Sequence, residues 1–352
     1  MIEESDTSES NAMTIEDDTQ GQLKRVAPTK TSKTIVLQAE EDFPFQQHEV
    51  KEVLILKHQE QDLPHGITLA VIRKFKKVSR RGRGQLILCD LTNKQELFAL
   101  THDRRLTYCD LHFIPKLRLL LHQDQTKIFY YFIDFKRFKI IPRGFTMIGA
   151  EIISISPAKD NMFLCHTEDI QTICFNYKTQ KSVFKITNPQ DPNGNYPFHV
   201  FLSNRNAFAM INCPEGAIKI FDFYSRNLLV RTNFEEERIT AISYIPEKDQ
   251  LMVGLYKLFE HSQIHSLDME TLAIKNSMTI NDCCVMEIIV DEAMETFTAW
   301  FTAAWLRTCT LDSFETIYQY KLNLHNLNQV EKFDENGKFL TLGEKLYLFN
   351  LD

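Results

Sequence analysis

The sequence predicts an all-β fold, a seven-bladed β-propeller of four-stranded antiparallel blades, because of its repeat, its spacing and its turn residues. Apolar, strand-like runs recur along the 352 residues, and one run in each unit ends at Asp or Asn before a short polar turn. A period of about 40–45 residues with strand patterning inside each unit is typical of a propeller blade. The repeated residues stand 38 to 46 positions apart: Asp90, Asp134, Asn176, Asp222, Asp268, Asp312 and Asn350.

The four expected strands are clearest in the unit around Asp268. Its apolar runs cover 239–245, 251–255, 263–267 and 272–278, and we name such strands a, b, c and d. The Asp or Asn that ends strand c suits the first position of a β-turn, because its side chain accepts hydrogen bonds from N–H groups of the turn. A Pro follows strand a in three units, where a missing N–H costs nothing: Pro115, Pro157 and Pro246.

The two ends of the chain are predicted to close the ring together. The sequence ends two residues after Asn350, so the last unit has strands a to c and lacks strand d. We expect the strand-like segment 34–40 to complete the last blade and remove its open edge; the alternative is an isolated strand. Residues 1–33 are predicted to form a disordered tail, first acidic and then basic, ahead of a propeller that covers 34–352.

Composition and cysteine usage point to an intracellular protein. The formal net charge is −7 at pH 7, and no apolar stretch is long enough for a transmembrane helix. The N-terminus is acidic, unlike a secretory signal or a transit peptide. The eight Cys are scattered through apolar runs, which indicates buried, reduced thiols rather than disulfides. We therefore expect a cytoplasmic or nuclear location.

These units resemble those of the WD-repeat β-propeller family across residues 34–352. The Trp-Asp dipeptide of that family is represented by its second residue, as in Cys89-Asp90 and Leu267-Asp268. The family's Gly-His pair is absent, so the match is to a divergent, WD-repeat-like propeller, and no Asp–His–Ser/Thr–Trp network is assigned to any blade. The resemblance implies a non-enzymatic scaffold for protein–protein interaction, a subunit of a larger complex.

Strand alternation separates the loops onto two faces of the predicted ring. The d–a and b–c loops share one face, and the a–b and c–d turns share the other. The first set is longer, with 73–84, 142–150, 188–197 and 257–262 as its main members. Because insertions in repeat proteins gather on the binding face, we expect partners on the face of the d–a and b–c loops.

The b–c loop of the first unit is the most distinctive candidate site. It is basic in a protein that is acidic overall, and the adjoining d–a loop adds two arginines. Such a cluster suits an acidic protein partner, the phosphates of RNA or DNA, or an anionic lipid surface; the alternative is a solvated insertion. Ser79 lies among these cations, and its phosphorylation would lower the local charge. The candidate residues are Arg73, Lys74, Lys76, Lys77, Arg80, Arg81, Arg83, Arg104 and Arg105.

The sequence offers no arrangement of residues that indicates an enzyme, a metal site or a cofactor. Gly82 and Gly84 lack the Lys-Ser/Thr that completes a phosphate-binding loop. Adjacent Cys283 and Cys284 face opposite sides of a strand, and His261 and His265 are too far apart on a strand to share a metal. Residues expected to be structural instead are His112, His122 and His166, together with Trp300 and Trp305, which we expect between blades.

Two functions are compatible with these features. The first is the interaction scaffold, in which one face of the propeller holds a protein partner. The alternative is a module that binds RNA, DNA or phosphoinositide headgroups through the basic loop of the first unit. No catalytic activity and no cofactor are expected from either.

Overall fold

The computed structural model divides the chain into two units, Met1–Ser32 and Lys33–Asp352, and it describes residues of the second. The predicted tail, 1–33, lies outside the described residues. Those residues are 34–37, 41–42, 49–56, 67–76, 83–102, 111–169, 171–187, 198–212, 216–257, 260–281, 283–291, 293–302, 305–322, 329–332, 339–342 and 346–349.

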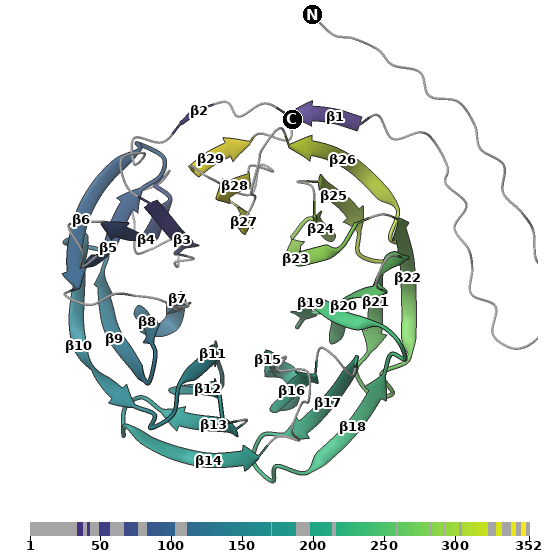
Figure 1. Cartoon of the computed structure of the whole chain (residues 1–352), viewed down its shortest axis with the longest axis horizontal. Coiled ribbons are helices and arrows are strands. Elements are labelled where there is room, and N and C mark those ends of the chain that lie inside the picture. Colours follow the sequence, from purple (N-terminus) through teal and green to yellow (C-terminus); the bar gives the residue numbers. More distant parts are fainter. Residues whose placement is uncertain are drawn as a thin grey trace, which may run out of the picture. The chain divides into compact units, whose positions relative to one another are not determined.

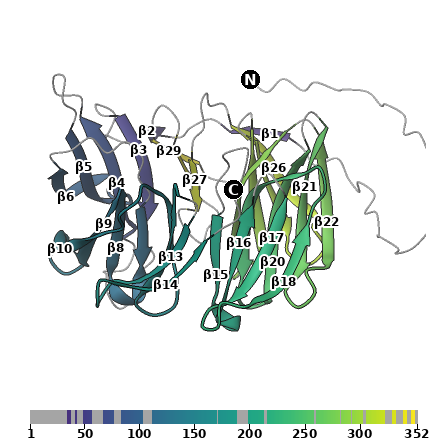
Figure 2. The same cartoon turned by 60° about the horizontal axis from the view of Figure 1, so that its bottom comes forward.

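The described strands form a β-propeller. Figure 1 shows its sheets side by side around a common axis, with strand a innermost and strand d at the rim. Figure 2 shows the strands running between the two faces. Strands β27 and β28 of the last blade lie against β3 of the first, so the first and last blades are neighbours.

The blades follow one another in chain order, and within each blade the chain runs from strand a to strand d. Blade 1 consists of β3 (Glu49–Ile55), β4 (Leu69–Lys76), β5 (Arg83–Asp90) and β6 (Gln95–His102). Blade 2 consists of β7 (Leu111–Ile114), β8 (Leu119–Asp124), β9 (Lys127–Asp134) and β10 (Lys139–Met147), with the short helix η2 (Pro115–Leu117) after β7. Blade 3 consists of β11 (Ile152–Pro157), β12 (Met162–Thr167), β13 (Gln171–Asn176) and β14 (Lys181–Thr187).

Blades 4 to 7 repeat this order. Blade 4 consists of β15 (Phe198–Leu202), β16 (Ala207–Asn212), β17 (Ala217–Asp222) and β18 (Leu228–Asn233), with η3 (Ser203–Arg205) after β15. Blade 5 consists of β19 (Arg238–Ile245), β20 (Gln250–Lys257), β21 (His261–Asp268) and β22 (Ile274–Asn281). Blade 6 consists of β23 (Val285–Asp291), β24 (Thr296–Phe301), β25 (Trp305–Thr310) and β26 (Thr316–Leu322). Blade 7 contains β27 (Gln329–Lys332), β28 (Phe339–Leu342) and β29 (Leu346–Phe349).

The prediction of seven four-stranded blades, closed by segment 34–40 in the last one, is wrong. The described residues form six four-stranded blades and one five-stranded sheet. Strand β1 (Thr34–Leu37) pairs in parallel with β26, outside a blade that already has four strands, because the outer edge of β26 offers free backbone groups. The strand that completes blade 7 is β2 (Glu41–Asp42), which pairs antiparallel with β29. The N-terminal segment therefore joins two blades.

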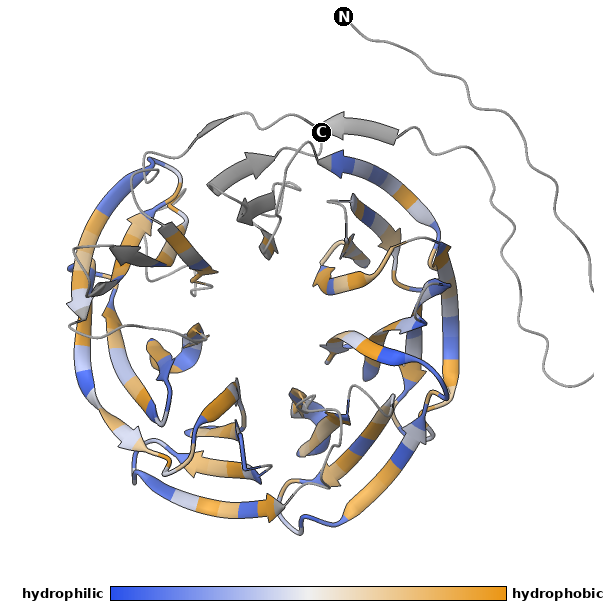
Figure 3. Ribbon diagram, viewed as in Figure 1, coloured by the Kyte–Doolittle hydropathy of each residue, from blue (hydrophilic) through white to orange (hydrophobic). Residues whose placement is uncertain are grey.

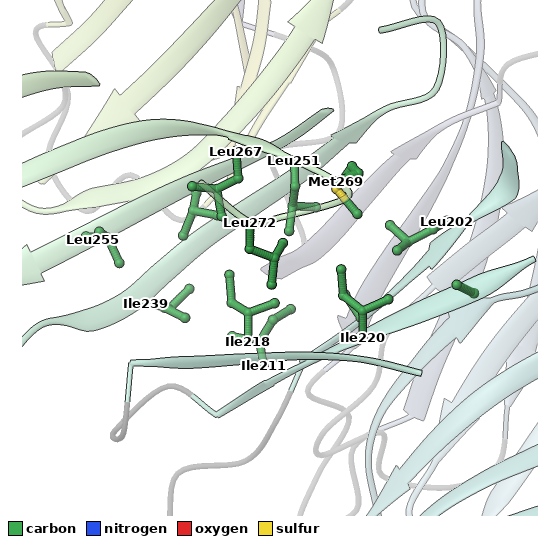
Figure 4. Close-up of a cluster of buried hydrophobic side chains, with 13 residues drawn as sticks. Leu202, Ile211, Ile218, Ile220, Ile239, Leu251, Leu255, Leu267, Met269 and Leu272 are labelled. Carbon is green, nitrogen blue, oxygen red and sulfur yellow. The ribbon is translucent and has the colours of Figure 1, made fainter. Parts of the chain in front are cut away.

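Apolar clusters between neighbouring blades form the core. The cluster between blades 4 and 5 joins Ile218 and Ile220 of β17 to Leu251 of β20 and Leu267 of β21 (Figure 4). Full burial of each such side chain contributes about 1.5–3 kcal/mol. Apolar and polar residues are interspersed along the outer strands of blades 3 to 5 (Figure 3). The inner strands thus pack through both faces, as β16 does with Ala209 toward blade 5 and Phe208 toward blade 3, and the outer strands meet solvent at the rim.

One predicted loop is mostly strand. Segment 142–150, expected as a d–a loop, belongs to β10 as far as Met147. The pairing of β10 with β9 shifts between Pro142 and Gly144, and Gly144 adopts a φ of 135° that favours glycine. This β-bulge accommodates a Pro, which has no N–H to donate, without ending the strand.

Two expectations about composition agree with the described residues. Cys89, Cys165, Cys174 and Cys309 are buried and form no disulfide. None of the helices in the described part of the chain is long and apolar enough to cross a membrane.

Candidate binding surfaces

The c–d turns are built on the last residue of strand c. The carboxylate Oδ1 of Asp134 accepts hydrogen bonds from the backbone N–H groups of Lys136 and Arg137, both at 3.1 Å. Asn176, Asp222 and Asp268 accept the equivalent pair of bonds in blades 3, 4 and 5. The predicted role of these residues is confirmed for these blades. The backbone N–H of Ser225 lowers the pKa of Asp222 in this way.

The prediction that strand c of blade 6 ends at Asp312 is wrong. Strand β25 ends at Thr310, whose Oγ1 accepts a hydrogen bond from the N–H of Glu315 at 3.1 Å. In blades 1 to 6 the residue four positions after the end of strand c is left-handed, and this residue is Phe314 in blade 6. Asp312 is therefore the second turn residue, equivalent to Tyr224 and Glu270. Asn350, the predicted residue of blade 7, lies outside the described residues.

Cations of the a–b turns link blades 3, 4, 5 and 6 to one another. In each of these links, the residue just before the left-handed residue of the turn reaches the next blade. Lys159 of blade 3 donates through Nζ to Asn206 Oδ1 at 2.6 Å and to the Tyr224 hydroxyl at 2.8 Å. Both acceptors belong to blade 4, one in its a–b turn and one in its c–d turn.

The next two links repeat the pattern with carboxylates. Arg205 of blade 4 pairs through Nη2 with Asp249 Oδ2 at 2.6 Å and lies 3.9 Å from Glu270 Oε1. The guanidinium lowers the pKa of Asp249. Lys248 of blade 5 pairs with Asp312 Oδ1 at 2.6 Å and lies 3.8 Å from Glu295 Oε1. We call Lys159, Arg205, Lys248 and their acceptors the inter-blade brace.

The brace does not extend to the interface between blades 2 and 3. The equivalent position in blade 2 is Leu117, just before the left-handed Arg118. Leu117 and Tyr177 both pack against the apolar cluster between these blades, so an apolar contact replaces the polar one. The second residue of the blade 3 c–d turn, where the brace would need an acceptor, is Lys178.

The turns of blades 2 and 3 therefore carry cations that take no part in the inter-blade brace. Lys116, Lys136, Arg137 and Lys178 are exposed, and among the described residues they make no ion pair. We call these four residues the basic surface. It lies on the face of the a–b and c–d turns, opposite the face on which we expected binding.

The predicted basic site of blade 1 is described only in part. Arg73 lies on β4, is 8% exposed and donates through Nε to Glu52 Oε2 at 3.1 Å. Glu52 also accepts the backbone N–H of Leu111, so this pair connects blade 1 to blade 2. Lys76 and Arg83 are directly opposed where β4 pairs with β5. The side chains of Lys74, Lys76 and Arg83, and the whole of Lys77, Ser79, Arg80, Arg81, Arg104 and Arg105, lie outside the described residues.

Buried histidines lie inside the blades, away from any metal-binding arrangement. His166 and His199 lie with ring centroids 5.7 Å apart across the interface of blades 3 and 4, and Thr172 Oγ1 is 2.8 Å from His199 Nε2. Burial lowers the pKa of His166 to about 4 and that of His199 to about 3. In the part of the chain that the structure describes, no three His, Cys, Asp or Glu residues gather as a metal site would require.

The expected structural role agrees with the burial of several residues. His122 and His166 are fully buried, and His112 is half-buried. Trp300 is buried and donates through Nε1 to Glu287 Oε2 at 2.9 Å. Trp305 is half-buried under the ammonium group of Lys321.

Two comparisons with known proteins identify no family for this chain. A scan against protein-family models finds no match, and a search of curated proteins finds none either. The β-propeller architecture therefore rests on the structure itself.

Sequence reasoning missed both the brace and the basic surface. Their signal was present in the turns, because the second residue after the end of strand c is Lys136, Lys178, Tyr224, Glu270 and Asp312 in successive blades. At this position blades 2 and 3 have a cation and blades 4 to 6 have an acceptor. The sequence shows this difference only once Thr310 is identified as the end of strand c in blade 6.

Proposed function

We propose that the protein is a non-enzymatic interaction scaffold, a divergent WD-repeat-like propeller subunit of a larger intracellular complex. The observation that carries this proposal is strand capture at the rim. Strand β1 pairs along the outer edge of β26, with Thr34 opposite Gln319 and Leu37 opposite Leu322. Main-chain pairing of this kind is a common way for a sheet edge to bind an extended segment.

Other rim strands have the properties of a protein-binding edge. The outer strands β14, β18 and β22 pair on one side only among the described strands. Their exposed apolar side chains are Val183, Leu228, Leu229 and Ile274. Leu228 and Leu229 are both exposed although they are neighbours in the sequence, because the pairing of β18 with β17 shifts by one residue at this point. Exposed apolar side chains beside free backbone groups favour contact with another protein over contact with water.

The proposal is tested by purifying the tagged protein from its native cells and analysing the complex by size-exclusion chromatography and mass spectrometry. We expect a stoichiometric protein partner with the wild type and its loss with Leu228→Glu/Leu229→Glu. The matched control is Arg231→Glu/Asn233→Glu, which alters exposed polar residues of the same strand and should keep the partner. A wild-type protein that elutes alone would contradict the proposal.

The second candidate is an anion-binding module at the hairpin of blade 1. It is favoured by the register of β4 and β5, which sets Lys76 opposite Arg83 and so brings basic residues from both strands together. Binding of RNA, DNA or phosphoinositides there would weaken steeply with salt and would fail in Arg80→Glu/Arg81→Glu/Arg83→Glu. Binding that is insensitive to salt would exclude this function.

A further inference from the structure

We propose that the basic surface of blades 2 and 3 binds a short acidic segment of a protein partner. This inference goes beyond the proposed scaffold, because the surface lies on the turns and not on the rim strands that carry the scaffold proposal. The two can fail independently. The proposal rests on which residues occupy the equivalent turn positions in the other blades.

In the blades that have the inter-blade brace, the cations of the a–b turns are paired with acceptors of the next blade. Arg205 and Lys248 each pair with a carboxylate of the next blade at 2.6 Å. The c–d turns of blades 2 and 3 carry Lys136 and Lys178 at the position that holds Glu270 and Asp312 in blades 5 and 6. A cation in place of an acceptor cannot serve the brace, so these charges face solvent.

The four cations belong to turns that meet at one edge. In blade 2, the backbone N–H of Ile133 donates to the carbonyl of Arg118 at 2.8 Å, which holds the a–b turn beside the end of strand c. The Arg118 guanidinium lies over the Phe135 ring, 5.8 Å from its centroid. Lys116 therefore lies on the same edge as Lys136 and Arg137. Blade 3 continues this edge, because Leu117 and Tyr177 share one apolar cluster.

The acids of these turns do not cancel the basic surface. Asp134 Oδ1 accepts two backbone N–H groups of its own turn. Asp160 is exposed and lies next to Lys159, whose ammonium it influences. Asp134 keeps its negative charge, but the four exposed cations outnumber these two carboxylates. In a protein with a formal net charge of −7, this local excess attracts a partner of opposite charge.

The extent of the surface favours a short acidic peptide over a nucleic acid. The same face becomes acidic at blades 5 and 6, where Glu247, Glu270, Glu295 and Asp312 are exposed. A long polyanion that crosses the face would be repelled there, whereas a segment as short as two blades would not. Proteins that bind single strands usually add exposed aromatic side chains for base stacking. The exposed large apolar residues of blades 2 and 3, which are Phe145, Met147 and Val183, lie on outer strands and not in these turns.

The test measures binding of a fluorescent peptide of alternating Glu and Ser to the full chain by anisotropy at several salt concentrations. We expect binding that weakens with salt, and a loss of about tenfold or more in Lys136→Glu/Arg137→Glu/Lys178→Glu, because charge complementarity becomes repulsion. The matched control is Lys185→Glu/Arg231→Glu/Arg238→Glu, which makes the same change in net charge at exposed residues elsewhere and should leave affinity nearly unchanged.

Several outcomes would overturn the proposal. These are no binding by the wild type at low salt, an equal loss in the control variant, or tighter binding of a single-stranded oligothymidylate of the same charge through these residues. If the Glu variant does not fold, Lys136→Gln/Arg137→Gln/Lys178→Gln replaces it, and unchanged affinity in that variant would refute the role of these cations.

Discussion

The interface between blades 4 and 5 and the interface between blades 2 and 3 are built on the same framework and use it differently. Both have a left-handed residue in the a–b turn, Asn206 and Arg118 respectively. In the first, Arg205 precedes that residue and reaches Asp249. In the second, Leu117 precedes it and packs into the apolar cluster. One repeat position thus supports a polar link in one place and an apolar contact in another.

On one face of the propeller, some turn residues thus stabilise the contact between blades, and others are left exposed to bind a partner. Where the brace is present, the cations of the a–b turns bind acceptors of the next blade. Where Leu117 of blade 2 makes an apolar contact instead, the c–d turn of blade 3 needs no acceptor, and the residue at that position is Lys178. A repeat protein can therefore vary its surface chemistry from blade to blade while it keeps one backbone.

The largest expected effect concerns the two interfaces on either side of the one between blades 2 and 3. Phe135 and Phe223 follow the last residue of strand c in blades 2 and 4, and each is 2% exposed. We expect Phe135→Ala and Phe223→Ala each to lower the free energy of unfolding by about 3–5 kcal/mol, because each leaves a cavity among packed rings. Chemical denaturation measures both. A large inequality would show that the interface of blades 1 and 2, which contains Phe135, and that of blades 3 and 4, which contains Phe223, differ in their cores.

The next effect is acid destabilisation at the interface of blades 3 and 4. The lowered pKa values of His166 and His199 mean that both are neutral in the folded protein, while the unfolded chain takes up protons as the pH falls below 6.5. Stability is therefore full above pH 6.5 and declines toward the folded-state values, by at most about 2 kcal/mol for each residue at about pH 5. Denaturation at a series of pH values measures this decline. His166→Gln/His199→Gln should flatten it, and an unchanged slope would assign the proton uptake to other groups.

The propeller architecture was predictable from sequence because strand patterning recurs along the chain and strand c ends at Asp or Asn in blades 1 to 5. Asp134, Asn176, Asp222 and Asp268 mark real strand ends, since the turn N–H groups need an acceptor there. Asp312 was misleading because Thr310 supplies the same acceptor two residues earlier, and a hydroxyl in an apolar strand gives no distinctive signal. Position in the repeat, and not residue type alone, decided its role.

Ring closure and the binding surface were less predictable for a related reason. Segment 34–40 has strand character, but the choice of β26 over β29 as its partner depends on which outer edge it reaches, and strand propensity does not encode that. The charges of Lys136 and Lys178 were visible in the sequence. That the brace does not need an acceptor at Lys178 depends on Leu117 of the preceding blade, which is a property of the assembled interface.

A smaller effect should separate the two interfaces directly. Arg205→Met removes the guanidinium that pairs with Asp249 and lies near Glu270, and Tyr244 remains as a hydrogen-bond donor to Asp249. Because this pair is partly exposed, we expect a loss of about 0.5–1 kcal/mol in the free energy of unfolding at low salt and less at high salt. Denaturation at two ionic strengths measures this. A loss that is independent of salt would mean that the stem of Arg205 packs, and that the brace is not electrostatic.

The smallest effect is the one that defines the comparison. Lys178→Gln in blade 3 removes an exposed cation from the position that Asp312 occupies in blade 6, and Lys248→Gln removes a cation that Asp312 binds. We expect the first to leave the midpoint of thermal unfolding unchanged and the second to lower it, since only the second breaks a link between blades. Parallel melting curves of the two variants and the wild type measure the difference. Equal midpoints at low salt would mean that the brace adds no stability and that its cations are as free to bind a partner as Lys178.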